Sequence, residues 1–407
     1  MTVTIDDIEL AHRRLAGIVK PTALIPSETL SRMIGGDVLI KPENLQKTGS
    51  FKIRGAYNRI AALSAGEKTR GVIAASAGNH GQALAYAATR AGVNATIVMP
   101  ETAAIAKVAA TRNYAQAVIL EGIDYQAARV AAGRICGELG AVFVDAYDDA
   151  HVVAGQGTVG LEIAAELKNS RGADAVLVPV GGGGLIAGIA VAFEALSPAT
   201  EVIGVEAAGS AQLSASLAAD KAASIGRPVD TIADGLATGR IGEIPYSLIR
   251  GRVRRAVTVD DFEIGAAVLL MLERMKLLAE GAGAAALAGA LKLGAELKGK
   301  KIVVVVSGGN IDINLLDRII GHGLSKMGRL YRIAVTLHDR PGELSLLLAQ
   351  IGKTGANVRA IDHDRTRRDI AIGGAYVSLE LETRGPEHIA AIHAHLRKAG
   401  YDIVEEN

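Results

Sequence analysis

A lysine between two apolar residues is the first feature of this sequence that could do chemistry. The segment reads KPENLQKTGSFKIRGA and places Lys52 between Phe51 and Ile53. A lysine held in an apolar site has a lowered pKa and can form a Schiff base with a carbonyl compound. An ordinary helix start, capped by Thr48 or Ser50 and carrying its charges on an exposed face, is the competing interpretation.

Two other segments deliver small polar residues directly after an apolar run. ASAGNHGQALAYAA brings Ser76 and Asn79 to such a junction, where backbone N–H groups bind anions and Asn79 adds a side-chain amide. IVVVVSGGNID ends its apolar run at Ser307, so a hydroxyl would enter the same crevice. Helix capping by these residues, or by Asn310, is the alternative.

A run of glycines lies in the segment VPVGGGGLIAGIA and comprises Gly181, Gly182, Gly183 and Gly184. Bare backbone before a helix N-terminus suits a phosphate. The segment also fits the dinucleotide fingerprint G-x-G-x-x-A at Gly182, Gly184 and Ala187, with Glu206 where a ribose-binding acid would lie. An NAD-dependent oxidoreductase is therefore a competing hypothesis, although Pro179 lies within the preceding run and the fingerprint alone is weak.

Alternating strands and helices would position these segments. Short apolar runs predict buried parallel strands at 72–75, 95–99, 117–120, 141–144, 175–180, 202–205 and 302–306. Ala-rich stretches between them predict helices at 81–92, 125–140 and 185–196. This alternation predicts a doubly wound α/β fold, in which ligands bind beyond the carboxyl ends of the strands.

The composition excludes several classes of partner. The 44 Lys and Arg nearly balance the 43 Asp and Glu, which leaves no basic field for a nucleic acid or an anionic membrane. The N-terminal MTVTIDDIEL is acidic where a signal peptide is basic, and no uninterrupted apolar run reaches ~20 residues. We expect a cytoplasmic protein with neither nucleic-acid nor membrane partners.

The last 80 or so residues have a different pattern. Strands expected at 331–338, 358–364, 375–382 and 401–406 alternate with helices at 344–351 and 389–398. The order is βαββαβ, a ferredoxin-like split unit. The sequence therefore predicts two domains, residues 1–328 and 329–407, with the boundary in the SKMGR segment after a helix at 311–324.

Together the motifs resemble those of a known enzyme family. SFKIRGA, SAGNHGQA, DDAHVVAGQGTVGLEI, VGGGGLIAG, ADGLA, EGAGAAALA and SGGN are similar, in order, to motifs of fold type II (tryptophan synthase β-like) pyridoxal-phosphate enzymes. The closest resemblance is to the threonine/serine ammonia-lyase and serine racemase group. The βαββαβ tail with its DRPGEL turn resembles an ACT regulatory domain.

The resemblance implies a function and a set of roles. Threonine would be deaminated to 2-oxobutanoate and serine to pyruvate, by β-elimination with pyridoxal 5'-phosphate. Lys52 would hold the cofactor and act as the general base. The other implied contacts are Phe51 beside the ring, Asn79 at the ring hydroxyl, Ser307 at the pyridine nitrogen, Gly181, Gly182, Gly183 and Gly184 at the phosphate, and Ser76, Gly78, Asn79 and His80 at the substrate carboxylate.

Two positions bear on sister activities. Serine racemases of this group have an acid/base serine where this sequence has Ala77, so the resemblance implies a lyase. Some relatives bind a divalent cation near the acid matching Glu206. The sequence departs from their pattern after Glu206, reading EAAGSAQ, and a strand-end Glu in a surface salt bridge is the alternative.

The tail predicts regulation and assembly. In ACT domains the turn after the first strand meets a neighbouring subunit around a small amino acid, and here that turn comprises Asp339, Arg340, Pro341 and Gly342. We expect isoleucine or valine to bind there in a homodimer or homotetramer. Feedback inhibition would suit isoleucine biosynthesis, and activation or indifference a catabolic role.

Overall fold

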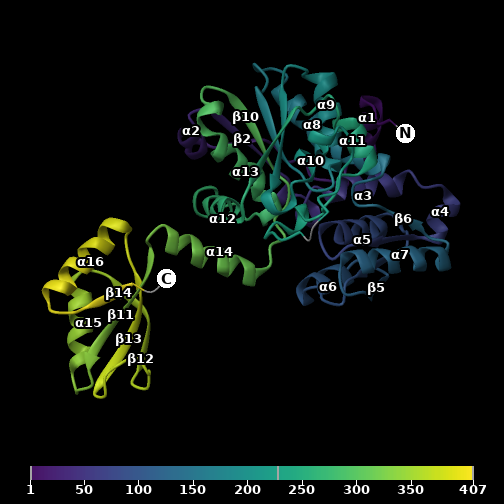
Figure 1. The fold of residues 1–407 in the computed structure, drawn as a ribbon. Coiled ribbons are helices and arrows are strands. Elements are labelled where there is room, and N and C mark those ends of the chain that lie inside the picture. Colours follow the sequence, from purple (N-terminus) through teal and green to yellow (C-terminus); the bar gives the residue numbers. More distant parts are fainter. Residues whose placement is uncertain (1, 227–228, 406–407) are drawn as a thin grey trace. The chain divides into compact units, whose positions relative to one another are not determined.

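The computed structural model describes residues 2–226 and 229–405, and the chain divides into two compact units, Met1–Asp312 and Ile313–Asn407 (Figure 1). The division falls at the start of α14 (Ile313–Lys326). The boundary expected at residue 328 lies at the other end of that helix, so α14 is counted with the second unit.

The first unit contains a large and a small sheet, each with helices around it. The large sheet has the order β1-β2-β10-β7-β8-β9 and is parallel except for β1. Its strands are β1 (Ile25–Pro26), β2 (Asp37–Pro42), β7 (Ala175–Pro179), β8 (Glu201–Ala207), β9 (Arg255–Val259) and β10 (Lys301–Val306). The helices around it are α1 (Ile5–Leu15), α2 (Glu28–Ile34), α8 (Ala150–Leu167), α9 (Gly184–Leu196), α10 (Gln212–Ala219), α11 (Glu243–Ile249), α12 (Asp261–Leu270) and α13 (Gly281–Leu293).

The small sheet is parallel throughout and has the order β5-β4-β3-β6. Its strands are β3 (Val72–Ala75), β4 (Ala95–Met99), β5 (Ala117–Leu120) and β6 (Val142–Phe143). Its helices are α3 (Lys52–Ala61), α4 (Ala65–Arg70), α5 (Asn79–Ala91), α6 (Ile105–Arg112) and α7 (Tyr125–Leu139). The predicted doubly wound α/β fold and all seven predicted strands of this unit are confirmed, with the run at 141–144 shortened to β6.

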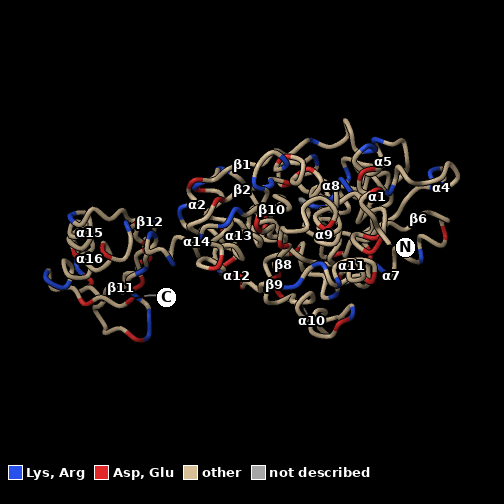
Figure 2. Tube along the Cα trace, turned by 90° about the horizontal axis from the view of Figure 1, so that it is seen from above, with Lys and Arg blue, Asp and Glu red and all other residues tan. Residues whose placement is uncertain are grey.

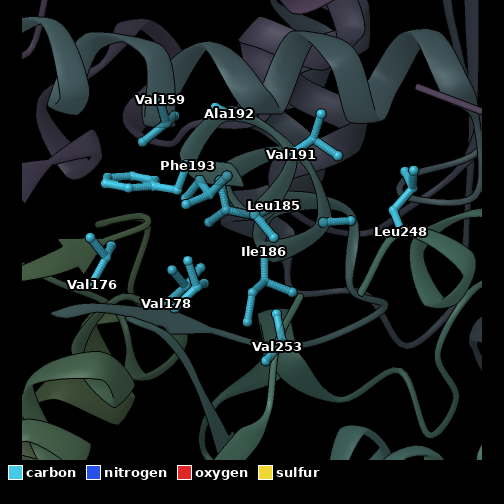
Figure 3. Close-up of a cluster of buried hydrophobic side chains, with 14 of the residues drawn as sticks. Val159, Val176, Val178, Leu185, Ile186, Val191, Ala192, Phe193, Leu248 and Val253 are labelled. Carbon is cyan, nitrogen blue, oxygen red and sulfur yellow. The ribbon is translucent and has the colours of Figure 1, made fainter. Parts of the chain in front are cut away.

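Many of the glycines in the first unit serve helix packing rather than a ligand. A Cβ on Gly188 of α9 would lie 2.5 Å from the backbone nitrogen of Gly157 of α8, so only glycine allows these backbones to approach so closely. Figure 3 shows the apolar side chains of α9, including Phe193, packed against Val176 and Val178 of β7. This buried helix begins at the last residue of the glycine run.

The second unit has the predicted βαββαβ order. After α14, its elements are β11 (Leu330–His338), α15 (Glu343–Lys353), β12 (Asn357–Asp364), β13 (Gly374–Glu382), α16 (Pro386–Lys398) and β14 (Ile403–Glu405). The sheet is antiparallel with the order β12-β13-β11-β14. The last predicted strand extends to Glu406, which lies outside the described residues.

Acidic and basic residues are not segregated along the chain. Figure 2 shows acidic and basic residues interspersed along the trace of each unit. Among the described residues, none of the helices combines the length and the apolar character that crossing a membrane requires.

Candidate active site

The start of α3 places Lys52 beside the carboxyl end of β10. The backbone nitrogen of Phe51 donates to the carbonyl oxygen of Ser307 at 3.1 Å, and Ser50 pairs with Gly308 in an isolated antiparallel β-bridge. No side chain caps α3, and the hydroxyls of Thr48 and Ser50 are buried without a hydrogen-bond partner in the described structure. The capping interpretation of this segment is therefore wrong, because backbone pairing with the β10 end fixes the helix start instead.

The amine of Lys52 lies beside a backbone carbonyl and an aromatic ring. Its Nζ donates to the carbonyl oxygen of Ala146 at 3.1 Å and lies 5.2 Å from the ring centroid of Phe51. Burial lowers the pKa of Lys52 to about 8, although the charges of Asp145 and Glu280 oppose this. An amine with this pKa is partly unprotonated near neutral pH, as a nucleophile or general base must be.

The tetraglycine loop, residues 181–184, joins the carboxyl end of β7 to α9. Because β7 and β10 are parallel neighbours, this loop and Ser307 lie at the same edge of the sheet. Gly183 has φ +92°, a left-handed conformation that favours glycine, and it immediately precedes α9. The first N–H groups of the helix have no partner within it, so the loop is built to receive an anion.

The segment around Tyr147 contacts both the tetraglycine loop and Lys52. A Cβ on Gly182 would lie 2.2 Å from Cγ of Tyr147, whose neighbour Ala146 accepts the hydrogen bond from Lys52. Asp145 accepts from the backbone nitrogens of Tyr147 at 3.1 Å and Asp148 at 3.0 Å and thereby fixes this segment. The sequence analysis missed Tyr147 and Asp145, and the only local signal was their position just before the DDAHVVAGQG motif.

We expect Gly182→Ala to disturb the site because the new methyl group would overlap the Tyr147 ring. The free energy of unfolding should fall by about 1–3 kcal/mol, as for other overpacked positions, and phosphate-ligand affinity should fall with it. Gly133→Ala is the matched control, since Gly133 lies exposed in α7 with open space around its Cα. Chemical denaturation of both variants measures the difference, and equal stability would contradict the expectation.

The Asn79 loop comprises residues 76–80, from the end of β3 to the first turn of α5. Side-chain hydrogen bonds link it to residues near the carboxyl end of β10. Nδ2 of Asn79 donates to Glu280 at 2.6 Å, and its Oδ1 accepts from Asn310 at 2.8 Å. In the described structure, no side chain caps the start of α5. The Ser76 hydroxyl instead accepts from the backbone nitrogen of Gly78, before the helix, at 3.2 Å. The structure thus brings Asn79 to the edge where Ser307 lies, through side-chain contacts rather than as a helix cap.

His80 follows Asn79 in the first turn of α5, and its side chain is buried. Its Nε2 lies 3.0 Å from the carbonyl oxygen of Val144, and its Nδ1 is buried without a partner in the described structure. Burial, helped by the charge of Lys52, lowers the pKa of His80 to about 4. The imidazole is therefore uncharged at neutral pH.

Glu280 is a functional candidate that the sequence analysis also missed. Burial raises its pKa to about 7, and its Oε1 lies beside Gly308 as well as Asn79. Its one local signal was the EGAGAAALA motif, in which an acid directly precedes the small residues of α13.

Glu206 is fully buried and serves the start of α10. Its carboxylate accepts from the backbone nitrogens of Leu213 and Ser214 and, at 2.7 Å, from the Ser214 hydroxyl. The surface salt-bridge alternative is therefore wrong. Within residues 2–226 and 229–405, no group of three or more His, Cys, Asp or Glu side chains could hold a metal ion.

Comparison with known proteins identifies the family. A family model described as "Pyridoxal-phosphate dependent enzyme" matches residues 15–308. The chain belongs to the pyridoxal-phosphate-dependent enzymes. The NAD-dependent oxidoreductase hypothesis is therefore wrong.

Individual relatives of this pyridoxal-phosphate enzyme narrow the group. An L-threonine ammonia-lyase from Thermotoga maritima is 47% identical over 403 residues, which cover 98% of this chain and 99% of the relative. A crystal structure of T.th. threonine deaminase has a TM-score of 0.72 and 39% identity over 76% of this chain and 99% of that one. A serine racemase from Dictyostelium discoideum has a TM-score of 0.71 and 34% identity over 77% of this chain and 100% of that one.

The side chains at the site fit pyridoxal phosphate. The cofactor has an aldehyde, a phosphate and a ring with polar substituents, and the site offers the Lys52 amine, the tetraglycine loop and the buried hydroxyl of Ser307. Among the described residues, the one hydrogen bond of that hydroxyl is a long donation of 3.4 Å to the carbonyl oxygen of Ala282, so it is available to a better partner. The unpartnered buried hydroxyls of Thr48 and Ser50 are further polar groups beside Lys52.

Proposed function

We propose that this enzyme deaminates L-threonine to 2-oxobutanoate and ammonia, and L-serine to pyruvate and ammonia. The observation that carries the proposal is the Lys52 amine, with a pKa of about 8, beside the segment that also packs on the tetraglycine loop. The identity to an L-threonine ammonia-lyase over nearly the whole of both chains supports the substrate.

The cofactor and the residues around it would contribute different parts of the chemistry. Pyridoxal phosphate, when bound, supplies an electron-withdrawing ring that stabilises negative charge at the substrate Cα. Lys52 would hold the cofactor, and its Nζ would accept the Cα proton of the substrate, for which a pKa near neutral is suited. Residues 181–184 would bind the phosphate through backbone N–H groups, Ser307 would bind the ring nitrogen, and Phe51 would pack beside the ring.

The Asn79 loop receives the substrate carboxylate and the ring hydroxyl. The backbone N–H groups of Asn79 and His80 lie in the first turn of α5, where a carboxylate is favoured. The backbone nitrogen of Ser76 donates to the carbonyl oxygen of Val98 at 3.0 Å and that of Gly78 to the Ser76 hydroxyl at 3.2 Å, so these two residues line the carboxylate site without offering a free N–H. The amide nitrogen of Asn79 has two hydrogens, and the bond to Glu280 uses one of them. The other remains for the ring hydroxyl.

Assays with threonine and serine test the proposed activity. The purified chain, loaded with pyridoxal phosphate, should release 2-oxobutanoate from L-threonine and pyruvate from L-serine. Because Ala77 replaces the serine that racemases use, D-serine should form much more slowly than pyruvate. D-serine formed at a rate comparable with pyruvate would indicate a racemase, and the absence of either oxo acid would refute the lyase proposal.

We also propose that the second unit binds isoleucine or valine and assembles the chain into a homodimer or homotetramer. Asp339, Arg340, Pro341 and Gly342 form an exposed turn before α15, and a Cβ on Gly342 would meet open space. Gly342 precedes the first turn of α15, where unpaired N–H groups suit a carboxylate. A biosynthetic role and a cytoplasmic location remain predictions from the sequence.

Titration of isoleucine and valine against threonine deamination tests this regulation. We expect the half-saturating threonine concentration to change about 5-fold or more in the wild type, within the usual range of allosteric coupling, and not in Gly342→Asp. Gly400→Asp is the matched control, because Gly400 has φ +90° against +93° for Gly342 and equally open surroundings. A wild type insensitive to both ligands in activity and assembly would refute the regulation and leave the lyase proposal intact.

A further inference from the structure

Gln212 is a fully buried residue at the start of α10, and its side chain holds the tetraglycine loop. Its Nε2 donates to the carbonyl oxygen of Gly181 at 2.9 Å. The same nitrogen lies 3.3 Å from the carbonyl oxygen of Leu236 and 3.2 Å from Oγ1 of Thr238. At the other end of the amide, the Ser210 hydroxyl donates to Oε1 at 2.6 Å. One buried amide therefore connects three segments of the chain.

The geometry of the peptide unit gives this contact a direction. In a planar trans peptide the carbonyl of one residue and the N–H of the next point in opposite directions. The bond from Gln212 to the Gly181 oxygen therefore turns the N–H of Gly182 away from Gln212. In the same way, the backbone nitrogen of Gly242 donates to the Gly182 oxygen at 3.1 Å and turns the N–H of Gly183 away from Gly242.

The loop has little freedom to move away from this position. A Cβ on Gly181 would lie 2.9 Å from the carbonyl oxygen of Gly235, so the loop backbone already packs directly on the 235–238 segment. The groups that face the Gln212 nitrogen are all oxygen acceptors. A neutral N–H donor can hydrogen-bond to these oxygens. A carboxylate would be repelled by their lone pairs, and an apolar side chain would leave the Gly181 oxygen without a hydrogen bond.

We propose that Gln212 is a positioning residue for the cofactor phosphate. Its amide fixes the peptide between Gly181 and Gly182 so that the Gly182 N–H faces the phosphate. This inference rests on the proposed function, in which residues 181–184 bind that phosphate. It assigns to Gln212 an action on the phosphate alone, through the backbone, and none on the Lys52 amine.

Binding of pyridoxal phosphate and of pyridoxal, which lacks the phosphate, tests the proposal. Gln212→Met keeps the length of the side chain and removes its donor, and Gln212→Glu keeps the shape and replaces the donor by an acceptor. We expect Gln212→Met to weaken pyridoxal phosphate binding about tenfold, because the peptide released from this hydrogen bond must be turned back before the Gly182 N–H can meet the phosphate, which costs about as much as one hydrogen bond contributes. Gln212→Glu should weaken it further. Pyridoxal, bound through Lys52, should bind both variants as it binds the wild type.

A matched control separates positioning from general loss of stability. Thr200 is buried, and its hydroxyl donates at 2.7 Å to the carbonyl oxygen of Ala173, just before the opposite end of β7. Thr200→Val should lower thermal stability and leave the ratio of the two affinities unchanged. Equal weakening of both ligands in Gln212→Met, or unchanged pyridoxal phosphate binding, would overturn the inference. A wild type that did not bind pyridoxal phosphate would overturn the proposed function as well.

Discussion

Lys52→Met should lower kcat/KM for threonine deamination by more than about 10³-fold, because one amine both attaches the cofactor and moves the substrate proton. Methionine keeps the length and apolar contacts of the side chain and removes its nitrogen. Formation of 2-oxobutanoate with saturating pyridoxal phosphate measures the effect. Lys47→Met removes an amine from the same segment and should leave the rate near that of the wild type. Retention of a tenth of the wild-type rate by Lys52→Met would refute the proposed role.

The lowered pKa of Lys52 also has a consequence for stability without cofactor. Its pKa is about 8 in the folded chain against an ordinary 10.5, so between these values the unfolded chain binds more protons and stability rises with pH. Below pH 8 the charged amine therefore lowers stability. Cofactor-free Lys52→Met should melt at a higher temperature than the wild type at pH 7, and the gap should close toward pH 10.5. A gap that grew with pH would contradict this expectation.

The parts of this site that could be predicted from sequence are those encoded locally. Each predicted strand of the first unit is an apolar run whose neighbours in the sheet supply the same kind of surface, so the run alone identifies it. The tetraglycine loop could be read in the same way, because four glycines between a strand and a helix need no distant partner to expose their backbone. Lys52 was found through its two apolar neighbours, Phe51 and Ile53.

The parts of the site that could not be predicted from sequence depend on contacts between residues far apart in the chain. Asn79 and Glu280 lie 201 positions apart, and only the fold brings their side chains to 2.6 Å. Gln212 stands in the segment EAAGSAQ, where nothing marks it as a partner of Gly181. The role of a buried polar side chain is set by its hydrogen-bond partner. For Gln212 that partner is a backbone oxygen, which has no signature in the sequence.

Glycine is ambiguous in sequence for a related reason. The run at residues 181–184 suggested backbone close to a phosphate. Gly157 and Gly188, however, bring two helices together, and a glycine looks the same in sequence whether a helix or a phosphate approaches it. The distinction depends on what lies opposite, which the fold alone decides.

A buried ionic network anchors the helix that carries Lys52. Arg54 is fully buried and binds Glu43 through Nε at 2.8 Å and Nη2 at 2.7 Å. Its Nη1 and Nη2 also donate to Glu162 of α8 at 2.6 Å and 2.9 Å. Lys41 of β2, likewise fully buried, donates to Glu162 at 2.6 Å. The capping interpretation placed the charges of this helix, Arg54 included, on an exposed face. That is wrong for Arg54, because Glu43 and Glu162, which lie 11 and 108 positions away in sequence, bind its guanidinium in the interior.

Removal of the cation from this network should be costly, because Glu43 would remain buried without its guanidinium partner. We expect Arg54→Met to lower the free energy of unfolding by about 3–5 kcal/mol, as measured when one partner of a buried ion pair is removed. Arg134→Met breaks ion pairs with Glu121 and Glu138 whose side chains are about half exposed, and it should cost about 0–1 kcal/mol. Urea unfolding of both variants at pH 7 measures the difference, and equal costs would contradict the expectation.

The pH dependence of the Arg54→Met effect provides an independent check of its electrostatic cause. Burial favours the neutral form of Glu162, but Arg54 and Lys41 outweigh it and hold the pKa of this carboxyl below its ordinary value. A carboxyl with a lowered folded pKa stabilises the protein above its unfolded pKa and loses that contribution as pH falls toward the folded pKa. Without Arg54 the Glu162 carboxylate can take up a proton more easily, so the stability gap between wild type and variant should narrow in acid. A gap independent of pH would instead assign the loss to packing of the arginine side chain.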